Sequence, residues 1–214
     1  MQVTQDIPLI EWGVAKRKFP GANESGDQYV VEPFQPRGPL PPSGILVGVI
    51  DGLGHGPKAA VAAKEAVATL QEHAHEPLVW LFERSHKRLR KTRGVVMSLA
   101  SFNARGKTMT WLGVGNVEGL YLREGAPAGA KPERLLLRGG IVGYRLPSLR
   151  PVVISVAPGD TLIFATDGLR SGFVNAANTP GSPQQIADEI FAQYYRGTDD
   201  AMILVARYVG AKDT

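Results

Sequence analysis

The chain has 214 residues, 43% of them hydrophobic, so it is long enough to bury a core. It contains no cysteine, which excludes disulfides, thiolate zinc sites and a cysteine nucleophile. The net charge is +4, but the sequence has no stripe of basic residues with aromatic residues between them, which argues against nucleic-acid binding. No apolar run reaches about 18 residues, and the polar start lacks the pattern of a signal peptide. We therefore expect a cytoplasmic protein that does not enter a membrane.

The first half of the chain predicts two strands followed by two helices. The second strand is an apolar run of the buried type, and it follows a loop rich in proline and glycine over residues 33–44. Pro57 suits the first turn of an alanine-rich helix, and the next helix has apolar residues at helical spacing. These elements cover residues 28–31, 45–50, 58–73 and 77–91.

The second half predicts mainly strands joined by short turns. A helix begins after Ser182, where Pro183 and Gln185 complete a capping pattern. Because hairpins dominate and the helices are grouped, we expect α+β architecture with antiparallel sheets covered by helices, not a doubly wound parallel sheet. The predicted strands cover residues 95–102, 108–114, 117–123, 134–137, 152–156, 161–166 and 201–208.

Four aspartates stand at the ends of predicted strands, each beside a flexible link. If these strands are neighbours, their carboxylates converge, and such closely packed like charges are tolerable when cations lie between them. Carboxylates without Cys or His companions suit Mg²⁺ or Mn²⁺. Two such ions about 3.5–4 Å apart can hold a hydroxide and a phosphoryl group. The four residues are Asp27, Asp51, Asp167 and Asp199.

Each of these aspartates, taken alone, is more often structural, since Asp-Gly is a common turn dipeptide and aspartates cap helices. The segment over residues 51–56 is more specific, because three glycines and His55 separate a buried strand from an alanine-rich helix. Its glycine spacing fits neither a dinucleotide fingerprint nor a Walker loop. Ser98 and Ser101 lack the context of a nucleophile elbow, so a hydrolase triad is unsupported.

Together these motifs resemble the type 2C metal-dependent (PPM) serine/threonine phosphatases, and within them the SpoIIE-like branch. The main motifs are Asp-Gly-Leu-Gly-His-Gly at residues 51–56, Ala-Thr-Asp-Gly-Leu at 165–169 and Thr-Asp-Asp-Ala at 198–201. Further segments resemble the RsbX-like phosphatases of stressosome partner-switching systems, and the match runs from about residue 11 to residue 208. These segments are residues 12–15, 25–27, 92–94 and 113–117.

The resemblance implies a four-layer αββα sandwich forming a single phosphatase domain over residues 1–214, with two divalent cations, Mn²⁺ or Mg²⁺. Asp51 would bridge both ions, and the Gly52 carbonyl would bind one of them. Asp27 would contribute to the same region, and Asp167 and Asp199 would hold the other ion. Asp200 and Asn116 would orient these ligands without binding the ions themselves.

Two departures from the family pattern concern the third metal and the phosphate. Asn116 stands where the broader family often has an acidic residue, which leaves a third ion unsupported. Eukaryotic members carry a phosphate-binding arginine upstream of the first aspartate. Lys16, Arg17 and Lys18 lie upstream here, but none aligns with that arginine, and phosphate binding would then rest on the metals.

The implied activity is hydrolysis of phosphoserine or phosphothreonine on STAS-domain proteins of a stressosome, by a monomer. The alternative is a pseudophosphatase that binds a phosphoprotein without turnover.

His55 could donate a proton to the leaving serine oxygen, or it could cap the helix or orient Asp51. The lone Arg93 has no assigned role. A basic helix face could dock an acidic partner or be a solvated surface. That face consists of Arg84, Lys87, Arg88 and Lys91.

Overall fold

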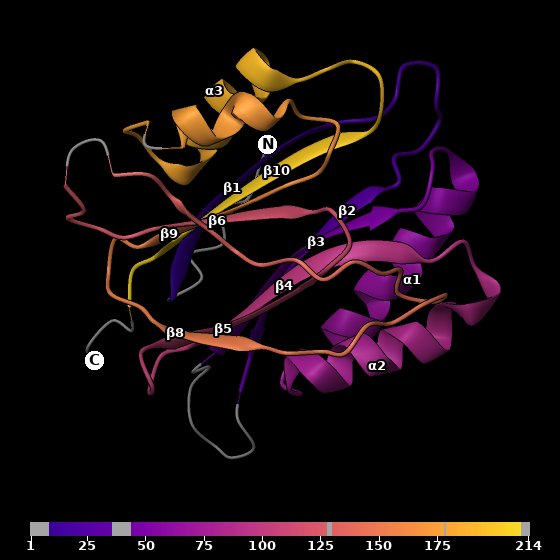
Figure 1. Cartoon of the computed structure of the whole chain (residues 1–214), viewed down its shortest axis with the longest axis horizontal. Coiled ribbons are helices and arrows are strands. Elements are labelled where there is room, and N and C mark those ends of the chain that lie inside the picture. Colours follow the sequence, from indigo (N-terminus) through magenta and orange to yellow (C-terminus); the bar gives the residue numbers. More distant parts are fainter. Residues whose placement is uncertain (1–8, 36–43, 128–129, 178, 211–214) are drawn as a thin grey trace.

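Two five-stranded antiparallel sheets pack face to face, and helices cover the outer face of each, as Figure 1 shows. This computed structural model describes residues 9–35, 44–127, 130–177 and 179–210. The predicted α+β class and the four-layer αββα sandwich are confirmed. The first eight residues and most of the predicted loop over residues 33–44 lie outside the described ranges. Within those ranges, no helix is long and apolar enough to cross a bilayer.

One sheet contains both ends of the described chain. The helix α3 (Pro183–Tyr194) packs on β1 and β10, and the 3-10 helix η2 (Ser171–Ala176) contacts α3. The capping box at Ser182 is present, with its side chain accepting from the Gln185 backbone N–H. The strands, in spatial order, are β1 (Ile10–Arg17), β10 (Ala201–Tyr208), β9 (Thr161–Ala165), β6 (Glu118–Leu122) and β7 (Glu133–Arg134).

The other sheet is covered by α1 (Pro57–Glu72) and α2 (Leu78–Arg88), with η1 (Leu89–Lys91) continuing from α2. Five alanines of α1, such as Ala59 and Ala66, are fully buried, because small side chains let the helix approach β2 and β3 closely. The strands, in spatial order, are β2 (Asp27–Phe34), β3 (Gly44–Gly52), β4 (Val95–Asn103), β5 (Thr108–Val114) and β8 (Val152–Ser155).

The core explains why the central strands are apolar along their whole length. Residues of β3, β4, β9 and β10 are buried on both faces, with one face in the core between the sheets and the other beneath helices.

The edge strand β1 is covered differently. Gln184 of α3 accepts from the Val14 N–H at 3.1 Å and donates to its carbonyl at 3.1 Å, so one side chain occupies this open edge.

Most predicted elements match the structure to within two residues. The short strand predicted over residues 28–31 is longer, since β2 runs Asp27–Phe34 and Asp27 is its first residue. Three further differences concern β1, the segment after β7 and the end of α2. The strand β1 was not predicted, because its edge position leaves most of its side chains partly exposed and its alternation weak. The strand predicted over residues 134–137 ends at Arg134, and Leu135 and Leu137 pack as loop residues against the inter-sheet core. The second helix ends at Arg88, where a 3-10 turn replaces its last residues.

Two histidines of the helical region, His73 and His86, are half-buried. The His73 ring packs edge-on against Trp80, with ring centroids 4.9 Å apart. The Nδ1 atom of His86 accepts a hydrogen bond from the Gly143 N–H at 3.0 Å. Desolvation, with a smaller contribution from Arg90, lowers the pKa of His86. The bond from Gly143 therefore ties α2 to the segment that follows β7.

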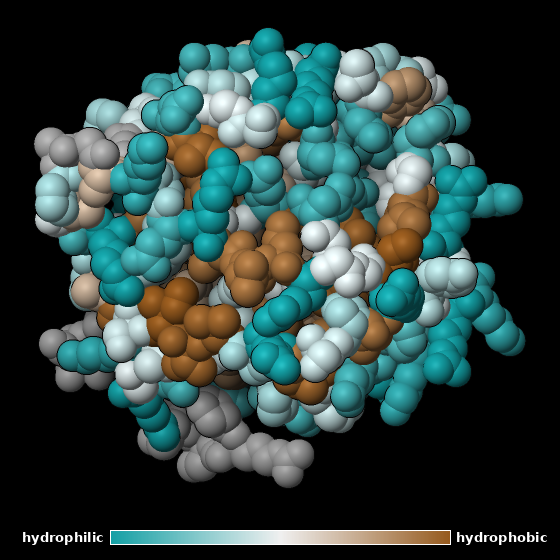
Figure 2. Space-filling view, in the orientation of Figure 1, coloured by the Kyte–Doolittle hydropathy of each residue, from teal (hydrophilic) through white to brown (hydrophobic). Residues whose placement is uncertain are grey.

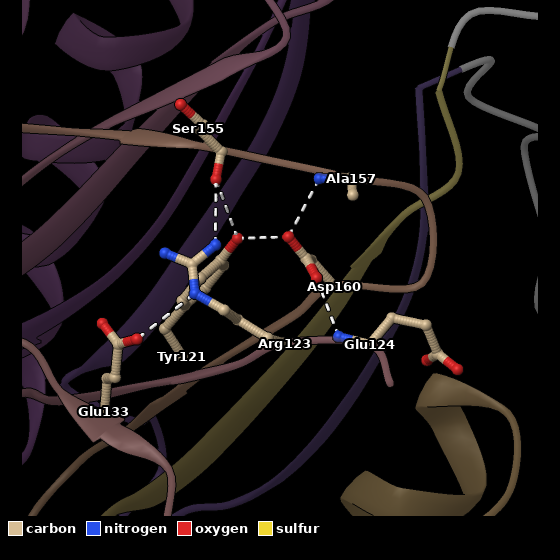
Figure 3. A network of polar contacts seen from close by, with 7 residues as sticks. All are labelled: Tyr121, Arg123, Glu124, Glu133, Ser155, Ala157 and Asp160. Atoms are coloured by element: carbon tan, nitrogen blue, oxygen red, sulfur yellow. Dashed lines mark hydrogen bonds and ion pairs between the residues drawn. The ribbon is translucent and has the colours of Figure 1, made fainter. Parts of the chain in front are cut away.

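A buried carboxylate fastens the turn between β8 and β9 to the end of β6. Figure 3 shows Asp160 accepting hydrogen bonds from the Tyr121 hydroxyl, the Ala157 N–H at 2.9 Å and the Glu124 N–H at 2.8 Å. Burial and the bond to Asp160 raise the pKa of Tyr121. Because each bond ends on the buried Asp160 carboxylate, this network holds β6 and the β8–β9 turn in one arrangement.

We expect Tyr121→Phe to lower the free energy of unfolding by about 1.5–3 kcal/mol, the usual range for a hydrogen bond to a charged group. Urea unfolding would measure the loss. Tyr208→Phe is the matched control, because Tyr208 is another buried tyrosine whose hydroxyl makes no hydrogen bond to any described residue. Equal losses in both variants would contradict a stabilising role for the Asp160 network.

Candidate active site

Two aspartates face each other at the end of one sheet. Asp27 begins β2 and Asp51 is the second-last residue of β3, and the antiparallel register pairs them directly. The Gly52 N–H donates to the Gly26 carbonyl at 3.1 Å, which continues the pairing beyond the strand. Directly opposed residues point to the same face of a sheet, with Cβ atoms about 4.5–5.5 Å apart. The two carboxylates therefore lie close together, and Asp27 is almost fully buried.

The second sheet brings a second group of carboxylates to the same place. Asp167 follows β9 and Asp199 precedes β10, and these strands are neighbours. Thr166 joins the two sheets, because its hydroxyl donates to Asp27 Oδ2 at 2.8 Å and accepts from the Met202 N–H at 2.8 Å. Sequence reasoning missed the role of Thr166, although it lies within the Ala-Thr-Asp-Gly-Leu motif.

Asp200 holds the loop that leads into β2. Its Oδ1 accepts from the Phe19 N–H at 2.8 Å, and its Oδ2 accepts from the Gly26 N–H at 2.8 Å. Its own N–H donates to Asp199 Oδ1 at 2.8 Å. Both carboxylate oxygens of Asp200 thus accept hydrogen bonds from the backbone, and one of these bonds positions Gly26, the residue before Asp27. Asp199, in contrast, lines the cavity.

The glycines after two of the aspartates are required by close backbone packing. A Cβ on Gly52 would lie 2.3 Å from the carbonyl oxygen of Ala59 in α1, and a Cβ on Gly168 would lie 2.0 Å from the Asp200 carbonyl oxygen. Real Cβ atoms do not come this near to backbone oxygens. The close packing of α1 on Gly52 is thus a reason for glycine at this position, in addition to the proposed approach of its carbonyl to a metal.

Two further candidates, Asn116 and His55, are both exposed but make different contacts. Asn116 donates from Nδ2 to Asp167 Oδ2 at 2.8 Å, so it orients that carboxylate. His55 is exposed, and its ring stacks on Phe19 with centroids 4.8 Å apart. Within the described residues, no hydrogen bond joins His55 to Asp51, and no side chain caps α1. The described residues therefore show no contact through which His55 would cap α1 or orient Asp51.

The electrostatics of the cluster oppose its full ionisation. Burial raises the pKa of Asp27 to about 7, and the charges of Asp200, Asp167 and Asp199 add to the rise, while the Thr166 hydrogen bond lowers it. Burial and the same neighbours raise the pKa of Asp51 well above its ordinary value. Burial also raises the pKa of Asp167, against the lowering effects of Arg196 and Asn116. Cations would relieve this repulsion.

The donor set fits hard divalent cations. Among the described residues, no three His, Cys, Asp or Glu side chains are arranged to hold one ion between them. Mg²⁺ is commonly held by one or two carboxylates, with waters filling the rest of its octahedral shell. Carboxylate and carbonyl oxygens, as at Asp51 and Gly52, are the ligands preferred by Mg²⁺ and Mn²⁺.

A cavity of about 380 Å³ opens where the two sheets meet. Asp51, Asp167, Asp199 and Asn116 line it on the polar side, and Gly54 and Ile141 are among its other lining residues. Asp27 and Asp200 lie behind this surface. The cavity therefore presents carboxylates from both sheets to one space large enough for a phosphoryl group.

A second hollow, of about 410 Å³, lies at the free edges of β7 and β8. Figure 2 shows hydrophobic residues gathered over β5 and β8 on this side of the molecule. Its lining includes the exposed Leu136, Val152 and Val153, and its one carboxylate is Glu133. It offers no cluster of metal ligands, so the cavity at the aspartates is the candidate site.

Comparisons with known proteins agree with this geometry. The family model described as "Stage II sporulation protein E (SpoIIE)" matches residues 41–209. A solved structure from work on "The bacterial stressosome: a modular system that has been adapted to control secondary messenger signaling" is 30% identical, has a TM-score of 0.80, and covers 92% of this chain and 99% of its own. A search of the curated proteins found no match.

Two more distant structures share the fold. The crystal structure of RsbX in complex with magnesium has a TM-score of 0.81 at 19% identity, over 95% of this chain and 98% of that one. The catalytic domain of the serine/threonine phosphatase PstP with two manganese ions has a TM-score of 0.69 at 15% identity, over 94% of this chain and 99% of that one. At these identities the likeness concerns the αββα sandwich itself.

We expect the stability of the metal-free protein to fall as the pH rises toward neutrality. An unfolded aspartate titrates near 3.8, whereas Asp27 in the fold titrates at about 7. Between these values the folded chain holds a proton that the unfolded chain has released, so stability is lost as the pH rises through this window. Thermal unfolding with chelator, measured across this range, would show the fall.

Asp27→Asn serves as the comparison for this pH dependence. The asparagine keeps an oxygen that can accept from Thr166 but has no carboxyl proton to lose. Its thermal midpoint should change less between acidic and neutral pH than that of the wild type. Identical slopes in the two proteins would show that Asp27 does not carry the raised pKa.

Proposed function

Because the chain belongs to the SpoIIE family, a family of PPM-type serine/threonine protein phosphatases, we propose that it hydrolyses phosphoserine and phosphothreonine on partner proteins. The observation that carries this proposal is the convergence of Asp51 from one sheet with Asp167 and Asp199 from the other at a single cavity. Oxygen ligands in such a group suit two divalent cations, Mn²⁺ or Mg²⁺.

The residues that would hold the cations come from both sheets. Asp51 would contact both ions and the Gly52 carbonyl one of them, with Asp27 in the same region, while Asp167 and Asp199 would hold the other. When bound, such ions lower the pKa of water and neutralise phosphate oxygens. The chain needs no side-chain nucleophile for this reaction.

The residues around these ligands set their positions. Thr166 fixes the Asp27 carboxylate, Asn116 fixes that of Asp167, and Asp200 fixes the loop before β2. Such partners restrict the rotamers of metal ligands and so define where substrate can bind. In the reaction, the oxygen of water bonds to phosphorus and the bond from phosphorus to the seryl oxygen breaks. The products are inorganic phosphate and the free hydroxyl.

His55 is the proposed source of the proton that the leaving seryl oxygen needs. It is exposed and lies in the same loop, residues 51–56, as Asp51 and Gly54, which line the cavity. Its stacking on Phe19 leaves the ring nitrogens available, since no hydrogen bond to them occurs within the described residues. Imidazole is the usual side chain for proton transfer at neutral pH.

The proposed substrates are phosphorylated STAS-domain proteins of a stressosome. Support comes from the RsbX-like segments of the sequence and from the 30% identical structure solved in work on the bacterial stressosome. In this scheme a kinase phosphorylates the STAS protein, and the present chain resets it as a monomer. The alternative is a module that binds the same phosphoprotein without turnover.

Phosphate release from a phosphoserine STAS-type protein tests the catalytic proposal. We expect release with Mn²⁺ or Mg²⁺, none with chelator, and a loss of about 100-fold or more in Asp51→Asn, because a central ligand is removed. Glu189→Gln is the control, since this exposed carboxylate on α3 lies outside the cavity lining. Binding of the phosphoprotein without release under any metal condition would favour the sequestering module.

A second comparison tests the proposed proton donor. His55→Gln should lower kcat on the phosphoserine protein by about 100-fold. The same variant should change hydrolysis of p-nitrophenyl phosphate much less, because nitrophenolate is a good leaving group that needs no proton. Equal losses on both substrates would contradict the role of His55 as the acid. Steady-state kinetics on the two substrates would measure both losses in kcat.

A further inference from the structure

Arg93 lies at the rim of the aspartate cavity. It stands between η1 and β4 and is exposed. A Cβ built on Gly54 would lie 2.9 Å from the Nη1 atom of Arg93, so the guanidinium rests against the Gly54 backbone. Gly54 lines the cavity together with Asp51, Asp167 and Asp199. The arginine therefore reaches the mouth of the site from the sheet that carries Asp51.

The backbone around Arg93 is fixed on both sides. The Thr92 N–H and hydroxyl both donate to the Leu89 carbonyl, at 2.9 and 2.8 Å, and the Gly94 N–H donates to the Thr92 hydroxyl at 3.0 Å. The Gly94 carbonyl accepts from the Leu53 N–H at 3.1 Å. One hydrogen bond thus connects the residue beside Arg93 to the residue beside Gly54.

Arg93 forms no ion pair with any residue that the structure describes. Other exposed arginines pair with carboxylates, for example Arg88 with Glu65 at 3.3 Å and Arg134 with Glu118 at 3.0 Å. Over residues 9–35, 44–127, 130–177 and 179–210, no Asp or Glu forms a salt bridge with Arg93. Its five N–H donors remain available for an anion at the cavity.

Lys16, Arg17 and Lys18, the cations considered for phosphate binding in the sequence, are placed elsewhere. Lys16 and Arg17 belong to β1, and they lie over the rings of Tyr29, at 5.4 Å, and Tyr195, at 5.2 Å. Neither they nor Lys18 contribute to the lining of the cavity. The upstream arginine of the eukaryotic phosphatases thus has no evident counterpart among them, while Arg93 occupies the rim.

We propose that Arg93 binds the phosphoryl group of the substrate, with its guanidinium contacting two phosphate oxygens from the loop before β4. A planar guanidinium matches two phosphate oxygens with parallel hydrogen bonds, which a lysine ammonium does not. This inference rests on the proposed phosphatase function. It also explains Gly54, whose φ of +77° favours glycine and whose missing side chain leaves room for the guanidinium.

The test compares Arg93→Ala and Arg93→Lys with Arg90→Ala, an exposed arginine in the same turn that makes no ion pair with a described residue. Inorganic phosphate binding is measured by thermal shift with Mg²⁺ present, and KM is measured with p-nitrophenyl phosphate. We expect Arg93→Ala to weaken phosphate binding and raise KM by about 10- to 100-fold. Arg93→Lys should recover part of this loss, and Arg90→Ala should behave as wild type.

A structural role for Arg93 would give a different pattern. In that case Arg93→Ala would lower the thermal midpoint and weaken the stabilisation by Mg²⁺ alone, with phosphate binding otherwise unchanged, and the inference would be overturned. Loss of phosphate binding with an unchanged response to Mg²⁺ supports it, even where the wild type shows no turnover and the catalytic proposal fails. Absence of phosphate binding in the wild type itself would overturn it.

Discussion

The structure depends on placing Asp27 and Asp51 opposite each other on paired strands, in a position where burial removes the water that would screen their charges. Desolvation and mutual repulsion disfavour this arrangement in the metal-free protein. It persists because β3, between β2 and β4, is apolar along nearly its whole length and buried beneath α1 on one face and the other sheet on the other. Hydrophobic burial of the strands therefore holds together charged groups that would otherwise separate.

The two sheets meet at this point through a small number of polar contacts. The Thr166 hydroxyl reaches from one sheet to Asp27 of the other, and Asp200 binds the backbone of the loop before β2. Close packing of Gly52 on α1 and of Gly168 on the start of β10 leaves these ends little freedom to move apart. The carboxylates that line the cavity are thus supported by a shell that makes few contacts with solvent.

The outer part of the site has a different character. His55, Arg93 and Asn116 are exposed, whereas the carboxylates that line the cavity range from the half-buried Asp51 and Asp199 to the exposed Asp167, with the buried Asp27 behind them. In the proposed reaction, the carboxylates that line the cavity would serve the chemistry at phosphorus, whereas recognition of a phosphorylated protein requires groups that a large partner can reach. Under this proposal, carboxylates held in place by Thr166, Asp200 and Asn116 would bind the cations, while the exposed donors at the rim would meet the phosphorylated protein.

The sequence by itself determined the elements with strong apolar patterns, the antiparallel character of the sheets and the position of four aspartates at strand ends. These properties depend on near neighbours in the chain, so local periodicity and turn chemistry suffice to predict them. Tertiary structure alone decided the sheet order, the edge strand β1, and the partners of Thr166, Asp200 and Arg93. Thr166 and Asp27 are 139 residues apart, and Asp200 and Phe19 are 181 apart. Such contacts arise from how the sheets pack, which no local pattern of residues encodes.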